Sequence, residues 1–114
     1  MPITNVYEQE KYLVVLGDYF RLLGFTESMI LSMISSADYF HTRFFEGWMA
    51  RIPTNVSFEN AAMSLCFSLG WANVYKDDTE QSASWTVPGY GVVKLSEIFT
   101  HGKSRTIIQI FNTR

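Results

Sequence analysis

The chain has 114 residues, of which 47% are hydrophobic, 16% aromatic and only 18% charged. A chain of this length forms one domain, residues 1–114, and this composition excludes an intrinsically disordered protein. The net charge of −2 gives no general attraction to nucleic acid or to an anionic membrane. The single cysteine, Cys66, excludes an internal disulfide and a cysteine-based zinc site.

The N-terminus lacks the basic and apolar regions of a secretory signal peptide. Charged residues also interrupt every apolar run well before the roughly 20 residues that a membrane span needs. A lone cysteine agrees with a reducing compartment. We therefore expect a cytoplasmic protein with no membrane partner and no cofactor.

The segment from Val6 to Leu23 predicts a first, amphipathic helix, with its apolar residues on one face and its charged residues away from it. Gly24 suits the left-handed position that often ends a helix.

The segment from Thr26 to Arg51 predicts a long second helix that begins at Thr26 as N-cap and ends before Pro53. Gly47 inside this helix costs about 1 kcal/mol relative to alanine, and a close neighbour would explain its presence. The apolar residues form two adjacent stripes, wider than the roughly 100° that a surface helix buries. The first stripe is Met29, Met33, Ala37, Phe40, Phe44 and Trp48, and the second is Ile30, Ile34, Phe45 and Met49. This helix is either the central pillar of the domain or partly the binding surface for a partner.

A third helix is expected to begin after Ser57 as N-cap and to end at Gly70. Its apolar spacing predicts a buried face made of Phe58, Ala61, Ala62, Leu65 and Leu69.

After Gly70 the pattern changes to strands, at Trp71–Lys76, Ala83–Val87, Val92–Leu95 and Arg105–Asn112. The last of these is apolar on both sides and is expected in the centre of the sheet. Ser96–His101 is consistent with either a strand or a helical turn. The predicted fold class is α+β, with three N-terminal helices, including a long central second helix, packed on a small C-terminal antiparallel sheet of three or four strands.

Two groups of residues are candidates for chemistry. Asp38 and His41, three residues apart, would share a helix face and supply part of a metal site, but the further carboxylates of such a site are missing, so no metal is expected. Cys66 with His41 and His101 could form a nucleophile and its base. Cys66 lies in an apolar run, which favours an inert buried thiol instead. No catalytic residue is assigned.

Charge is uneven along the chain, with one Lys/Arg against four Asp/Glu in residues 58–87 and four against one in residues 88–114. The two regions are expected to lie side by side in the fold. Asp77, Asp78 and Glu80 form either a solvated hairpin turn or a negative projection that docks into a basic groove. Tyr90, in the glycine-containing loop 87–91, is a further candidate contact.

Aromatic residues are concentrated in the second half of the predicted long helix. Tyr and Trp are enriched at binding hot spots, although the same rings could simply fill the core. Tyr39, Phe45, Trp48 and Met49 are the residues predicted to face a partner or a second copy of the chain.

The sequence therefore predicts a small protein-interaction module, a stoichiometric inhibitor or adaptor of the immunity-protein or phage anti-defence type that acts by steric block. Two alternatives stay open. One is a winged-helix-like nucleic-acid-binding protein, in which Lys94 and residues 101–105 contact phosphates. The other is a small enzyme or ligand-binding protein with a pocket between helices and sheet.

Overall fold

The computed structural model describes residues 16–88 and 91–113. Within them the chain forms a helical segment over residues 16–22 and then eight further elements. These are α2 (Glu27–Ser35), β1 (Asp38–His41), β2 (Phe45–Arg51), α3 (Phe58–Leu69), β3 (Asn73–Lys76), β4 (Glu80–Val87), β5 (Gly91–Thr100) and β6 (Lys103–Thr113). The expected first helix lies largely outside the described residues.

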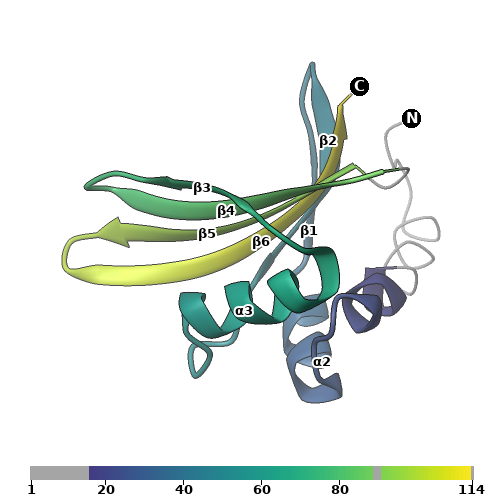
Figure 1. Cartoon of the computed structure of the whole chain (residues 1–114), viewed down its shortest axis with the longest axis horizontal. Coiled ribbons are helices and arrows are strands. Elements are labelled where there is room, and N and C mark those ends of the chain that lie inside the picture. The colour runs from purple at the N-terminus through teal and green to yellow at the C-terminus, as the bar shows by residue number, and fades with distance from the viewer. Residues whose placement is uncertain (1–15, 89–90, 114) are drawn as a thin grey trace.

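All six strands form one antiparallel sheet in the order β1-β2-β6-β5-β4-β3. Helices α2 and α3 and the 16–22 segment lie on one side of this strongly twisted sheet (Figure 1). The predicted sheet of three or four strands is therefore wrong, and so is the grouping of all helices before all strands. The fold is α+β with a larger sheet, because two strands precede α3 and join the others through β6.

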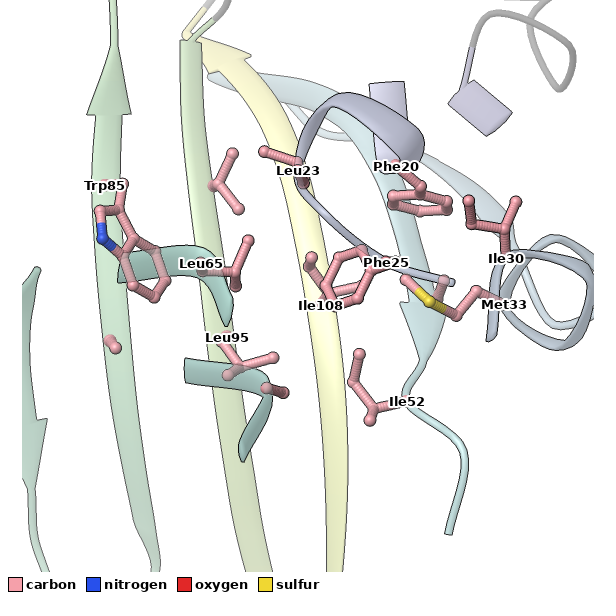
Figure 2. Close-up of a cluster of buried hydrophobic side chains, with 14 of the residues drawn as sticks. Phe20, Leu23, Phe25, Ile30, Met33, Ile52, Leu65, Trp85, Leu95 and Ile108 are labelled. Atoms are coloured by element: carbon pink, nitrogen blue, oxygen red, sulfur yellow. The ribbon is translucent and has the colours of Figure 1, made fainter. Parts of the chain in front are cut away.

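The two faces of the sheet have different neighbours. On the face toward the helices, here called the inner face, Ala50 of β2 lies opposite Ile108 of β6, which lies opposite Leu95 of β5. Helical side chains cover these residues and complete the core (Figure 2). The core consists of Leu16, Phe20, Leu23, Phe25, Ile30, Met33, Ala50, Ile52, Phe58, Ala61, Leu65, Ala83, Trp85, Val93, Leu95 and Ile108. None of the described helices is both long and apolar enough to cross a membrane.

The predicted long helix from Thr26 to Arg51 is wrong beyond its first third. Helix α2 ends at Ser35, where the hydroxyl of Ser35 donates to the carbonyl of Ser32 and that of Ser36 to the carbonyl of Met33. The Ser36 hydroxyl then accepts a hydrogen bond from the backbone N–H of Arg51, at 2.9 Å, which ties the helix end to β2. Serine hydroxyls compete in this way for helical carbonyls and favour a helix end.

The aromatic half of the predicted helix forms the β1–β2 hairpin instead. Aromatic residues have high strand propensity, and cross-strand pairing gives them partners that a helix does not. Tyr39 lies opposite Trp48, and their rings meet edge to face at 5.6 Å. The backbone N–H of Thr42 donates to the Phe45 carbonyl, at 2.7 Å, and closes the turn.

Gly47 has the close neighbour that explains a glycine at this position. The neighbour lies on β6, the strand paired with β2, and not on a helix. Gly47 lies opposite Phe111, and a Cβ at Gly47 would come within 2.6 Å of Phe111 Cα and 2.7 Å of Phe111 Cβ. Beside it, the rings of Phe40 and Phe45 pack edge to face on Phe111, at 6.1 and 5.4 Å. The missing side chain thus lets three rings gather on the outer face, the face away from the helices.

Several local predictions are confirmed. The Thr26 hydroxyl accepts from the N–H of Met29 as N-cap of α2, and Gly24 has a φ of 94° after the first helix. The third helix has the predicted bounds, with Ser57 as N-cap and Phe58, Ala61 and Leu65 buried. The strand Arg105–Asn112 lies inside β6, between β2 and β5 in the sheet.

Strand pairing decides the structure of Ser96–His101, for which the sequence pattern allows either a strand or a helical turn. The first five residues of this segment continue β5 to Thr100, paired with β6 on one side and, as far as Ile98, with β4 on the other. His101 lies in the turn between β5 and β6.

Replacing Gly47 by alanine should reduce the free energy of unfolding by about 3 kcal/mol, the upper end of the usual cost of overpacking, because the clash involves backbone atoms of β6. Thr86→Ala, at an exposed position of β4, is the control and should change it by less than about 0.5 kcal/mol. Urea denaturation measures both. Equal effects of the two variants would contradict the close approach at Gly47.

Candidate functional site

The residues predicted to face a partner lie on opposite faces of the sheet. Tyr39 and Trp48 are on the inner face, half-buried, and the Tyr39 hydroxyl donates to Glu46 Oε2 at 2.7 Å. Phe45 and Met49 are on the outer face, where Phe45 is exposed and Met49 half-buried. The four residues therefore do not form one surface, because a strand points alternate side chains in opposite directions. The remaining aromatic candidate, Tyr90, lies outside the described residues.

The acidic residues form the predicted hairpin turn, between β3 and β4. The carboxylate of Asp77 accepts hydrogen bonds from the Tyr75 hydroxyl, from the N–H and hydroxyl of Thr79, and from the N–H of Glu80, at 2.7 to 2.9 Å. These hydrogen bonds, led by the one from Tyr75, hold the pKa of the Asp77 carboxyl well below its ordinary value. Asp77 thus builds the turn, and Asp78, which is also exposed, lies beside it.

The acidic and basic regions lie side by side, as expected. Glu80 of β4 is opposite Ile98 of β5, which is opposite Arg105 of β6, so the three residues form a row across one face. Neighbouring strands are about 4.8 Å apart, which places Glu80 about 10 Å from Arg105 along this row. At that distance Glu80 and Arg105 attract each other across the sheet, but they do not form an ion pair in the part of the chain that the structure describes.

The pair Asp38 and His41 does not form a ligand set. Both residues belong to β1, and the register places Asp38 on the outer face with Met49 and His41 on the inner face with Glu46. Residues three positions apart lie on the same side of a helix but on opposite sides of a strand. Within residues 16–88 and 91–113 no cluster of three or more His, Cys, Asp or Glu residues could hold a metal ion.

Cys66, His41 and His101 are not brought together. His41 lies in β1, at the edge of the sheet opposite β3, whereas Cys66 and His101 line two different hollows. The expectation of a buried thiol is also wrong, because Cys66 is exposed on α3.

The structure explains His101 through the backbone instead. His101 has a φ of 52° and Gly102 a φ of 74°, and Thr100 pairs with Lys103 on either side of them. Two consecutive residues with positive φ form the turn that matches the twist of a two-residue hairpin, in which Asn-Gly is preferred. His101 therefore occupies a turn position at which asparagine is the preferred residue.

An apolar groove on α3 is the most exposed hydrophobic feature of the described residues. Trp71 is 99% exposed, Phe67 88% and Met63 57%. Together with Cys66 and Gly70 these residues line a hollow of about 340 Å³, and we call it the α3 groove. Isolated exposed apolar residues are ordinary on protein surfaces, but three adjacent ones around a hollow are typical of an interaction site.

The position of Trp71 follows from the end of α3. Gly70 has a φ of 89°, a backbone conformation that other residues rarely adopt, and its N–H donates to the Cys66 carbonyl at 2.8 Å. This conformation sets the direction in which the chain leaves the helix. The carbonyl of Gly70 accepts a hydrogen bond at 3.0 Å from the indole Nε1 of the buried Trp85. The core thereby fixes the corner that places Trp71 in solvent.

The sequence carries a signal for this groove, although none of the groove residues is among the predicted partner residues. Met63 and Phe67 lie outside the predicted buried face of α3, yet both are large and apolar. Such residues on the solvent side of an otherwise well-defined amphipathic helix indicate a surface that can bind a partner.

A second, polar hollow of about 740 Å³ lies between α2, the β2–α3 connection and the adjacent ends of β5 and β6. Hydroxyl side chains, including Ser32 and Thr54, line it together with Arg51, Arg105 and Glu97. Both arginines are exposed, and Glu97 accepts a hydrogen bond from Gln81. Its charges are therefore solvated or already paired, and the α3 groove is the stronger candidate.

The chain matches none of the protein-family models, curated proteins or solved structures with which it was compared. The candidate site therefore depends on its own geometry.

Replacing His101 by asparagine should raise the free energy of unfolding by about 0.5 to 1 kcal/mol, because asparagine adopts the left-handed conformation more readily. His41→Asn, in β1, is the control and should give no such gain. Urea denaturation of both variants measures the difference. A loss of stability in His101→Asn would show that the imidazole itself has a structural role.

The Asp77 carboxyl should titrate well below its ordinary value of 3.8. Since the pKa is lowered in the folded protein, the ionised carboxylate stabilises the turn fully above that ordinary value, and this contribution is lost as the pH falls through the lowered pKa. The ¹³C shift of the carboxyl, followed by NMR, measures the midpoint. Asp77→Ala should speed exchange of the Thr79 and Glu80 amides, whereas Asp78→Ala should not. Similar exchange in both variants would contradict this role.

Proposed function

We propose that this protein is a protein-binding module whose docking surface is the α3 groove, and that it acts stoichiometrically, as an inhibitor or an adaptor. The observation that carries the proposal is the nearly complete exposure of Trp71 and Phe67 beside Met63. Aromatic residues and methionine are enriched at protein interfaces, and tryptophan is among the commonest hot-spot residues.

The energetics of the groove favour binding. Burial of an exposed phenylalanine or methionine side chain contributes about 1.5 to 3 kcal/mol of transfer free energy, and three large side chains are available here. The backbone at Gly70 is fixed by its hydrogen bonds to Cys66 and Trp85, so part of the ordering cost is met before a partner arrives. Such a surface acts by contact, either blocking a partner or joining it to another molecule.

The two alternative functions have less support. The nucleic-acid alternative depended on a helical trio followed by a hairpin, and in the observed order β1 and β2 separate α2 from α3. The enzyme alternative depended on Cys66, His41 and His101, which lie apart in the fold. The α3 groove is instead lined almost wholly by apolar side chains.

Removing the rings of the groove should strongly weaken partner binding without unfolding the protein. The test variant is Phe67→Ala/Trp71→Ala, and the matched control is Phe44→Ala, which removes a 59% exposed ring in the β1–β2 turn. Wild type and both variants are immobilised and exposed to lysate of the native host. The partner retained by wild type is then purified, and its affinity for each protein is measured by calorimetry. Loss of two hot-spot rings should weaken binding by at least about 100-fold, with one partner bound per chain.

Thermal unfolding of the variants separates binding from stability, and all three proteins should unfold at closely similar temperatures because these rings are exposed. Equal binding by wild type and the double variant would show that the α3 groove is not the docking surface. Retention of no specific protein by wild type would contradict the binding function itself.

A further inference from the structure

A free edge of the sheet follows the α3 groove along the chain, because the edge strand β3 begins three residues after Gly70. The hydroxyl of Ser68 donates to the carbonyl of Leu23 at 2.7 Å, so this flank of α3 faces the segment that follows the first helix. Successive residues of a helix are rotated by about 100°, which places Cys66 about 160° around the helix from Ser68. The flank of α3 with Cys66 therefore faces the β3 side, whereas Met63 and Phe67, each about 160° from the buried Leu65, point away from the sheet.

At that edge, β4 is the one described strand that pairs with β3. All four of its residues are exposed, and Val74 is 80% exposed although it lies on the inner face, opposite Ala83. The opposite edge strand, β1, differs, since Tyr39 and Phe40 are half-buried in ring contacts. The apolar centre of β3 is thus available to a partner.

The backbone of β3 specifies the conformation of that partner. In an antiparallel pair, the N–H and C=O groups of alternate residues point away from the neighbouring strand, so two of the four residues of β3 present both groups outward. An exposed edge of this kind is a template for another extended chain, and a helix cannot satisfy its hydrogen bonds. Lys76 is the one charged residue of β3 and lies at its end, so it leaves the centre of the edge open.

Charge at the end of β3 specifies the partner further. The turn after Lys76 carries Asp77 and Asp78, both exposed, and β4 begins there with Glu80. A strand added antiparallel to β3 would have its N-terminal end beside this turn. A basic residue at that end would meet two carboxylates, whereas a second copy of this chain would bring the uncharged residues Trp71 and Ala72 there.

We infer that the occupant of this site is an extended segment of another polypeptide that adds to β3 as a seventh, antiparallel strand. Alternate apolar side chains of the segment face the α3 groove, and a Lys or Arg at its N-terminal end lies beside Asp77 and Asp78. This inference rests on the proposed function, since it names the partner of the same groove.

A display library of random eight-residue peptides, selected on the immobilised full chain, tests the inference directly. The enriched peptides should have apolar residues at every second position and Lys or Arg near the N-terminus. Enrichment of helical spacing, of acidic termini, or of no peptide at all would overturn it.

The enriched peptide then allows three sharper measurements. N-methylation at single positions of the peptide should weaken binding about tenfold where the replaced N–H would face β3. It should hardly affect binding where that N–H would face solvent. Cys66, the only cysteine of the chain, should react more slowly with a maleimide when the peptide is bound, because it lines the groove. Asp78→Lys should weaken binding a few-fold, and a peptide with Glu in place of its basic residue should restore it.

Hydrogen exchange separates failure of this inference from failure of the proposed function. Peptide binding that protects the outward amides of β3 supports strand addition. Protection of Cys66 without protection of β3, or equal effects of N-methylation on both sets of positions, would overturn strand addition while the groove remained a docking surface. Protection of Cys66 that rises with protein concentration alone, with a dimer mass by light scattering, would overturn it in favour of a second copy.

Discussion

The fold depends on the pairing of β6 with two strands that come from different parts of the chain. β2, from the first half of the chain, lies on one side of β6, and β5, from the second half, lies on the other. Without β6 the β1–β2 hairpin would have no sheet to join, and isolated two-stranded hairpins are marginally stable in water. Ile108 and Ile110 then extend the inner face across both halves, which gives α2 and α3 one common surface to cover.

The candidate site is a consequence of this arrangement at the far edge of the sheet. Because α3 packs across β4 and β5 through Ala61 and Leu65, its opposite side carries Phe67 into solvent. The hydrogen bond from Trp85 to Gly70 connects the core to the corner where α3 ends. β3 begins three residues after Gly70, so the free strand edge follows the apolar groove closely along the chain.

Sequence patterns predicted the second half of the fold better than the first. α3 was predicted from Ser57 to Gly70 because its cap, its apolar spacing and its terminal glycine all agree. The pattern of residues 36–51 predicts a helix because Phe40, Phe44 and Trp48 also fit a helical period. Over a short window rich in apolar residues, helical and strand periods are hard to separate.

The sequence by itself determined the caps at Thr26 and Ser57, the buried face of α3, the β3–β4 turn and the central place of β6. Each of these depends on interactions within a few residues or on one strand's own composition. Only the tertiary structure decided that Gly47 lies against Phe111, that Tyr39 and Phe45 belong to opposite faces, and that Phe67, Trp71 and Val74 remain exposed. The physical reason is that burial depends on which distant segments cover a side chain, and a local pattern gives no information about a neighbour sixty residues away.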